Sequence, residues 1–198
     1  MQLLLLAIAQ EEKQQLRSAA LSKRDALAMD DRIEKSLQAT DHALSSIEFE
    51  AGTVVSGFFP IRSEIDPRPL MDHFRQMGAR LCLPVVMDKT TIIFRELIRT
   101  AELVDTGFGT RGPAEGAEVL DPSLLIMPMS AFDLKGGRIG YGAGHYDRAI
   151  AKLITKGISP RLIGMAYDCQ RIDSVPVEAH DQPLEGIITE SGYYKVAS

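Results

Sequence analysis

A glycine-rich segment in the last third of the sequence carries its strongest chemical signal. Five of the 16 glycines lie between Gly136 and Gly144, accompanied by Arg138, Asp147 and Arg148. Glycines let backbone N–H groups surround an anion, and a helix that begins after them adds a partial positive charge. The arginines could bind phosphate oxygens, and Asp147 could hold a divalent metal between phosphates. The alternative is a tight strand-to-helix turn, but a turn needs only one or two glycines, so the segment favours a phosphate site.

This segment matches no common nucleotide motif. It lacks the G-K-[ST] sequence of a Walker A loop, and its G-x-G-x-G spacing differs from the G-x-G-x-x-G fingerprint of dinucleotide-binding proteins. Serine and cysteine nucleophiles find little support, because no G-x-S-x-G occurs and Cys169 lies in no nucleophile motif. Chemistry on a bound phosphate is therefore the better-supported function.

Three basic residues near the N-terminus form a second group. Offsets of 4 and 11 residues place Lys13, Arg17 and Arg24 on one face of a predicted helix. This face could reach a triphosphate bound by the glycine-rich segment. From the spacing alone, a solvated basic face paired with acidic neighbours such as Asp25 is the favoured interpretation.

Loop residues give weaker signals. Glu64 follows a predicted strand and could contact a ligand, but a solvated loop residue is an equally good interpretation. Asp66 is expected to cap a helix whose first residue is Pro67. Asp181 could be a second metal ligand, although a turn residue is the safer interpretation. Phe108, between two glycines, could stack on a flat ligand or fill the core.

The elements that must position these residues alternate between helices and strands. Apolar spacing and helix-forming residues predict helices over 10–29, 31–47, 66–78 and 145–155. Strands are predicted over 53–59, 80–86, 92–97, 124–129, 161–167 and 186–190, with a long loop over 105–116. The continuously apolar run at 124–129 is typical of a strand buried on both faces. The alternation predicts a Rossmann-like, three-layer α/β/α sandwich around a mostly parallel, mixed sheet.

Composition narrows the class of protein. A chain of 198 residues with 45% apolar residues suits one domain, with residues 1–9 as an extension or the start of the first helix. A net charge of -5 argues against nucleic-acid binding. Two cysteines without metal-ligand spacing exclude zinc fingers and fit a reducing cytosol. The apolar stretch 3–8 lacks the basic start of a signal peptide and the roughly 20 residues of a membrane span. We therefore expect a cytoplasmic protein that binds no membrane.

The segment from Gly137 to Arg148, GRIGYGAGHYDR, resembles the signature of the 5-formyltetrahydrofolate cyclo-ligases, also called methenyltetrahydrofolate synthetases. Further pieces agree in their order along the chain: K-x-x-x-R at 13–17, E-I-D at 64–66, PMSAFD at 128–133, AYDCQ at 166–170, VP at 175–176, HD at 180–181 and ITE at 188–190. The resemblance implies a monomeric enzyme that uses ATP and Mg²⁺ to close 5-formyltetrahydrofolate, with or without a polyglutamate tail, to 5,10-methenyltetrahydrofolate, releasing ADP and phosphate.

The resemblance also implies roles for individual residues. For ATP they are Lys13, Gln14, Gln15, Leu16, Arg17, Arg138, Ile139, Gly140, Tyr141, Gly142, Ala143, Gly144, His145 and Tyr146. For the folate they are Arg17, Phe59, Glu64, Phe108, Tyr141, Gly142, Ala143, Gly144 and His145. Asp147 and Asp181 would bind Mg²⁺, and Arg138, Tyr146 and Arg148 would act in catalysis.

This chain departs from the family pattern within the signature. The family usually has tyrosine at the position of His145, and some members carry basic residues at the positions of Tyr141 and Ala143. Two other classes of function fit the glycine-rich segment. One is a phosphate-ligand enzyme of the sugar-phosphate isomerase type, and the other is a non-catalytic module that binds a nucleotide or a folate.

Overall fold

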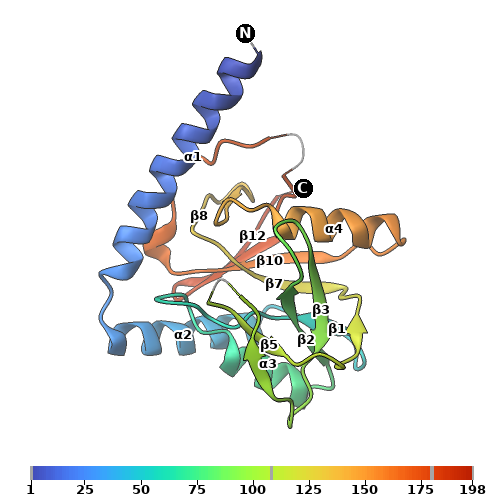
Figure 1. Cartoon of the computed structure of the whole chain (residues 1–198). Helices are drawn as coiled ribbons and strands as arrows, with labels where there is room; N and C mark the ends of the chain where they lie inside the picture. Colours follow the sequence, from blue (N-terminus) through green and yellow to red (C-terminus); the bar gives the residue numbers. More distant parts are fainter. Residues whose placement is uncertain (1, 108, 179–180, 198) are drawn as a thin grey trace.

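A mixed sheet forms the centre of the computed structural model, which describes residues 2–107, 109–178 and 181–197, with side chains from residue 10 onward (Figure 1). Within these residues the sheet has eight strands, in the order β12 (Gly192–Lys195), β11 (Gly186–Thr189), β10 (Arg161–Met165), β7 (Leu124–Pro128), β1 (Val54–Ser56), β2 (Arg80–Val86), β3 (Ile92–Glu96) and β6 (Val119–Leu120). Neighbouring strands from β11 to β2 run parallel, whereas β12, β3 and β6 pair antiparallel. The predicted mixed, mostly parallel sheet is confirmed.

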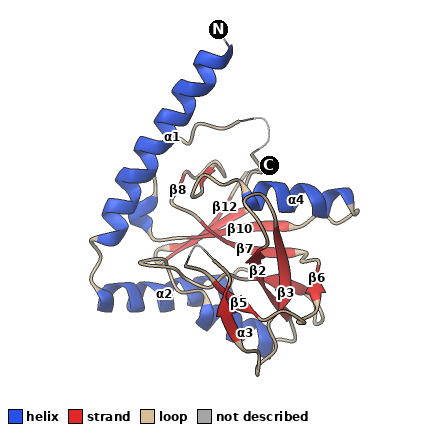
Figure 2. Ribbon diagram, viewed as in Figure 1, coloured by secondary structure: helices blue, strands red, loops and turns tan. Residues whose placement is uncertain are grey.

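Helices cover both faces of this sheet (Figure 2). On one face, α2 (Met29–Leu44) and α3 (Arg68–Gln76) contribute the buried Ala39 and Phe74 to a core that also contains Ile126 of β7. On the other face, Ile150 of α4 (His145–Thr155) packs into a second core with Met127. Alternate residues of β7 thus enter different cores, which is why its apolar run is continuous. The three-layer sandwich is confirmed.

The N-terminal helix α1 (Gln2–Asp25) lies beside the sandwich. It contacts the short strand β8 (Ala131–Phe132) and the 3₁₀ helix η1 (Asp168–Gln170). It ends four residues earlier than the sequence predicted, because a turn at residues 26–27 separates it from α2. No helix in the described part of the chain combines the length and apolar character that crossing a membrane would require.

Several short strands were not predicted from the sequence. The stretch 105–116, expected to be a loop, holds part of a hairpin of β4 (Leu103–Asp105) and β5 (Arg111–Pro113). Hydrogen bonds between Thr106 and Thr110 close its turn, with 2.8 Å between their hydroxyl oxygens. The two-residue strands β6, β8 and β9 (Arg138–Ile139) are too short to show alternation. β12 was likewise not predicted.

The strand predicted over 53–59 and the helix predicted over 66–78 are both shorter in the structure. β1 stops at Ser56, so the chain leaves the sheet before Phe58. Helix α3 begins at Arg68, one residue after Pro67. Pro67 is therefore the N-cap, and the prediction that Asp66 caps this helix is wrong, although the Asp66 carboxylate accepts the Arg68 backbone N–H at 2.9 Å.

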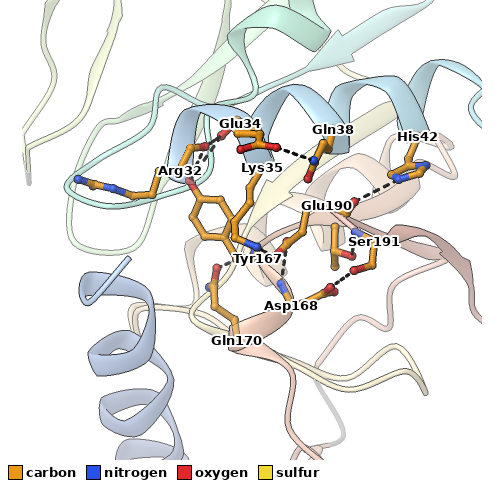
Figure 3. A network of polar contacts seen from close by, with 12 residues as sticks. Arg32, Glu34, Lys35, Gln38, His42, Tyr167, Asp168, Gln170, Glu190 and Ser191 are labelled. Atoms are coloured by element: carbon orange, nitrogen blue, oxygen red, sulfur yellow. Dashed lines mark hydrogen bonds and ion pairs between the residues drawn. The ribbon is translucent and has the colours of Figure 1, made fainter. Parts of the chain in front are cut away.

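A network of polar contacts holds α2 against β11 and η1 (Figure 3). Lys35 Nζ lies 2.7 Å from Glu190 Oε1, and this hydrogen bond raises the pKa of Lys35. Glu190 Oε2 accepts the Asp168 backbone N–H at 2.9 Å. The Gln170 amide donates to the carbonyls of residues 129 and 130, at 2.6 and 3.1 Å. Because those carbonyls directly follow β7, the network fixes the chain that leads into the glycine-rich segment.

Close packing in the centre of the sheet predicts a large cost for one added methyl group. A Cβ at Gly164 in β10 would lie 2.1 Å from Met129 Cε and 2.8 Å from Leu184 Cδ1. Both of those side chains are buried. Gly164→Ala is therefore expected to lower the free energy of unfolding by about 1–3 kcal/mol, measured by urea denaturation. Gly140→Ala is the control, because its Cβ would meet no atom within 4 Å. Equal stability of the two variants would contradict the packing described.

Candidate active site

A cavity of about 930 Å³ opens at the carboxyl ends of β1, β2 and β7. Phe59 lines it just after β1, Val86 at the end of β2, and Pro128 at the end of β7. From β1 the chain adds β2 on one side and later returns to place β7 on the other, so the strand order reverses between them. Ligands of open α/β sheets bind at such switch points. The glycine-rich segment and α1 form much of the remaining wall.

The glycine-rich segment forms a cradle between β9 and α4. Gly142 and Gly144 have φ angles of +99° and +63°, which a residue with a Cβ rarely adopts. Gly144 is the N-cap of α4, and no described side chain caps this helix. The first N–H groups of α4 therefore face the cavity without side-chain competition, as an anion site requires.

The basic residues of α1 face this cradle. Lys13 Nζ lies 2.8 Å from Asp181 Oδ2, and Arg17 Nε donates to the Gly140 carbonyl at 2.7 Å. Burial lowers the pKa of Arg17. The shared helical face is confirmed, but the solvated face favoured from spacing is wrong. The side chain of Lys13, beside Glu178 and Asp181, is 14% exposed, and that of Arg24, beside Ser63 and Tyr141, only 1%.

Carboxylates and an arginine meet at one end of the cavity. Arg138 Nη2 lies 2.5 Å from Asp147 Oδ1, which also accepts the backbone N–H of Gln182 at 3.3 Å. Because Gln182 follows Asp181 directly, the two aspartates predicted as metal ligands lie at the same end. Among the described residues, no group of three or more His, Cys, Asp or Glu side chains has a metal-binding arrangement. Two carboxylates nevertheless suit Mg²⁺, which often binds one or two carboxylates together with phosphate oxygens.

Two residues at the start of α4 contact the turn between β2 and β3. Arg148 Nε donates to the Thr90 carbonyl at 2.7 Å, and Arg148 also donates to the carbonyl of Ala143. His145 Nε2 lies 3.3 Å from the carbonyl oxygen of Asp88. Both side chains line the cavity, and their contacts hold the turn against the start of α4.

Tyr146 presents an unusual group to the same cavity. Its hydroxyl is buried and has no hydrogen-bond partner among the described residues. Burial raises the pKa of Tyr146, so the phenol keeps its proton at neutral pH. A buried donor without an acceptor costs free energy. A ligand oxygen at this position would recover that free energy.

Another part of the cavity wall is aromatic and acidic. Glu64 is only 9% exposed, so the solvated alternative for this residue is wrong. Its Oε1 accepts the Tyr141 hydroxyl at 2.8 Å, and its Oε2 accepts the Ile61 backbone N–H at 2.9 Å. Desolvation outweighs these hydrogen bonds and raises the pKa of Glu64. The ring of Phe59 lies 5.8 Å from the guanidinium carbon of Arg111.

The structure brings most of the predicted residues together. Gln14 lines the cavity beside Arg17, to which it is hydrogen bonded. Gln15 is exposed outside the cavity wall, and Leu16 packs against a small core below α1. Phe108 lies outside the described residues. The remaining predicted residues all line the cavity: Lys13, Arg17, Phe59, Glu64, Arg138, Ile139, Gly140, Tyr141, Gly142, Ala143, Gly144, His145, Tyr146, Asp147, Arg148 and Asp181.

Sequence reasoning missed other residues of the cavity wall. Arg62 and Arg111 lie near its aromatic end, and Glu178 lies 3.7 Å from Lys13 Nζ. Arg111 falls in the stretch expected to be a loop, where no periodicity indicated its direction. Arg62 has a φ of +54°, a backbone conformation that its residue type does not predict.

A phosphate cradle and a buried carboxylate in one switch-point cavity define an α/β enzyme that brings an anionic ligand and a second ligand together. Comparison with known proteins gives this class a name. The model of the 5-formyltetrahydrofolate cyclo-ligase family matches residues 9–190, and the chain belongs to that family. Its activity is the conversion of 5-formyltetrahydrofolate to 5,10-methenyltetrahydrofolate, as the sequence indicated. Membership decides against the isomerase-type and binding-module alternatives.

Individual relatives agree over nearly the whole chain. The 5-formyltetrahydrofolate cyclo-ligase of Haemophilus influenzae is 28% identical over 184 residues, covering 90% of this chain and 97% of the relative. That of Escherichia coli is 30% identical over 175 residues, covering 85% and 95%. The solved 5,10-methenyltetrahydrofolate synthetase of Aquifex aeolicus has a TM-score of 0.77 and 29% identity, covering 94% of this chain and 93% of that one. The fold and the family therefore agree.

Proposed function

We propose that ATP and 5-formyltetrahydrofolate occupy opposite ends of this one cavity, with the γ-phosphate directed toward the formyl group. The carrying observation is that one cavity wall holds both a cationic set of residues and an aromatic, acidic set. Lys13, Arg17 and Arg138 line the cavity with the glycine cradle, and Phe59 and the buried Glu64 line it as well. The cationic end suits a triphosphate, and the aromatic, acidic end suits a flat ring with N–H donors.

The chemistry of this arrangement proceeds in two steps. The formyl oxygen attacks the γ-phosphorus of ATP, ADP leaves, and an activated formyl carbon results. N10 of the folate then attacks that carbon and releases its proton to solvent, the C–O bond breaks, and phosphate departs as the five-membered ring closes. Phosphoryl transfer depends mainly on positioning and charge neutralisation, which the N–H cradle and Arg138 supply. Tyr146, which keeps its proton, would donate to an oxygen of the transferring group.

The aspartates at the cationic end fit Mg²⁺ by the chemistry of their oxygen donors. Asp147 and Asp181 would hold the ion, with phosphate oxygens completing its coordination. When bound, Mg²⁺ neutralises charge on the phosphates. Arg138 orients Asp147 through their 2.5 Å contact, and Lys13 does the same for Asp181 at 2.8 Å.

We also propose that the enzyme acts as a monomer of one domain in the cytoplasm. The two cysteines, of which Cys82 is buried and Cys169 partly buried, are free thiols, as a reducing compartment requires.

Turnover should require both ATP and Mg²⁺. Purified protein mixed with 5-formyltetrahydrofolate is expected to generate the near-ultraviolet absorbance of the methenyl product only when both are present. The control omits each in turn and adds a chelator to the complete mixture. Product formation without ATP would contradict the proposed chemistry. Absence of product from a folded protein that binds ATP would contradict the proposed function as a whole.

A further inference from the structure

A series of hydrogen bonds connects α1 to the cavity wall through Arg24, a residue with no assigned role. Arg24 Nε donates to the Ser63 hydroxyl at 2.9 Å, and its Nη1 donates to the Tyr141 hydroxyl at 3.0 Å. Tyr141 in turn lies 2.8 Å from Glu64 Oε1. These hydrogen bonds therefore connect the N-terminal helix, through the glycine-rich segment, to the carboxylate of Glu64 in the loop after β1.

The direction of these hydrogen bonds is fixed by chemistry. A guanidinium can only donate, so the Tyr141 oxygen must accept from Arg24. The phenol has a single O–H, which then donates its hydrogen bond to Glu64. Arg24 thus determines which way the hydroxyl of Tyr141 points. Without it, the hydroxyl could rotate away from the carboxylate or turn toward solvent.

Burial of the Arg24 guanidinium costs free energy of folding. Arg24 is 1% exposed, and Asp25 Oδ1, its nearest acidic oxygen, lies 3.7 Å from its Nε on a side chain that is 57% exposed. Burying a guanidinium without a close, buried counter-ion costs free energy. The second buried charge nearby is Glu64 itself, to which Tyr141 connects it.

We propose that Arg24 is a positioning residue that holds the Tyr141 hydroxyl against Glu64 and so prepares this carboxylate to bind the folate ring. The proposal rests on the proposed function, because it requires Glu64 to accept hydrogen bonds from the folate. It also joins the glycine-rich segment, which would bind ATP, to the folate end of the cavity.

The ionisation of Glu64 depends on several facing groups. Burial raises its pKa, while the Ile61 backbone N–H, the Tyr141 hydroxyl and the charges of Arg24 and Arg62 lower it. The Tyr146 phenol also faces it. Removing Arg24 removes one of the favourable charges and releases Tyr141. The folate would then lose its ionised partner at a higher pH than in the unaltered protein.

The test measures binding of 5-formyltetrahydrofolate without nucleotide, by calorimetry from pH 5 to pH 9. Arg24→Met and Tyr141→Phe are each expected to weaken binding at pH 7 about tenfold. Each should also shift the acidic loss of affinity to higher pH. The double variant should lose less affinity than the sum of the two single losses, because both substitutions break the same link. Arg161→Met is the control, since Arg161 pairs with Glu185 at 3.0 Å at the opposite ends of the strands.

Defined outcomes overturn the proposal. Additive losses in the double variant, or an unshifted pH profile in Arg24→Met, would show that Arg24 does not act through Tyr141. If Arg24→Met does not fold, Ser63→Ala replaces it in the test, because it removes the hydroxyl that accepts from Arg24 Nε and donates to Asp25. If the unaltered enzyme turns over but the pH profile of folate binding is unshifted in Arg24→Met, this inference alone is contradicted. Failure of the unaltered protein to bind or convert the folate would contradict both this inference and the proposed function.

Discussion

Asp147→Ala is expected to lower kcat about 10²–10³-fold while the protein stays folded. Asp147 contacts Arg138 Nη2 at 2.5 Å and would share Mg²⁺ with Asp181. The substitution would therefore remove a proposed Mg²⁺ ligand and release Arg138 from its carboxylate partner. Turnover at saturating ATP and folate measures the effect, and circular dichroism checks the fold.

Asp121→Ala provides a matched control for this substitution. Asp121 is also an aspartate paired with a cation, Lys156, at 2.7 Å, but it lies at the opposite ends of the strands from the cavity. Its loss should leave kcat unchanged. Asp147→Asn should retain more activity than Asp147→Ala if holding Arg138 is the main role, and no more if the metal dominates. Normal turnover by a folded Asp147→Ala protein would exclude Asp147 from the active site.

Glu64→Gln is expected to raise the KM for 5-formyltetrahydrofolate about 10–100-fold, because hydrogen bonds to a charged acceptor are the stronger ones. The substituted amide would keep the shape of the side chain but not its charge. The KM for ATP should change less, because Glu64 is hydrogen bonded to Ile61 and Tyr141, whereas Arg138 pairs with Asp147. Steady-state kinetics with each substrate varied in turn measures both values. A large change in the KM for ATP would contradict the division of the cavity.

The same substitution should change how stability depends on pH. Burial raises the pKa of Glu64 in the folded protein, so between its ordinary and raised pKa the folded state binds more protons than the unfolded state. The contribution of Glu64 to the free energy of unfolding is therefore greatest below its ordinary pKa and declines as pH rises through the raised pKa. Glu64→Gln should lack this decline. The difference in Tm between the two proteins across pH 4–8 measures it, and a constant difference would contradict the raised pKa.

Much of the fold could be predicted from periodicity and length. The continuous apolar run of β7 and the glycine-bounded helix α4 were found where the sequence indicated them, because burial on both faces and helix entry leave strong local signals. The short strand β9 and the hairpin of β4 and β5 were missed. Their partners lie close by in the sequence, but strands of two or three residues are too short to show an alternating pattern.

Part of the site could also be predicted, because that part is formed by residues that are neighbours in the sequence. The glycine-rich segment is local, so its residues and their resemblance to a family were visible directly. Glu64 and Arg24 were ambiguous, because their environment is set by long-range contacts with Tyr141, which is 77 and 117 residues away along the chain. Spacing showed that Arg24 shares a face with Lys13 but not that other segments bury that face.

The most direct test of the central claim follows the oxygen of the formyl group. If the formyl oxygen attacks ATP, 5-formyltetrahydrofolate labelled with oxygen-18 in that group should release phosphate that contains one labelled oxygen per turnover. Mass spectrometry of the released phosphate measures this transfer. Unlabelled phosphate, with the label in water, would mean that ATP is cleaved without phosphorylation of the folate. That result would contradict the placement of both ligands in one cavity with the γ-phosphate against the formyl group.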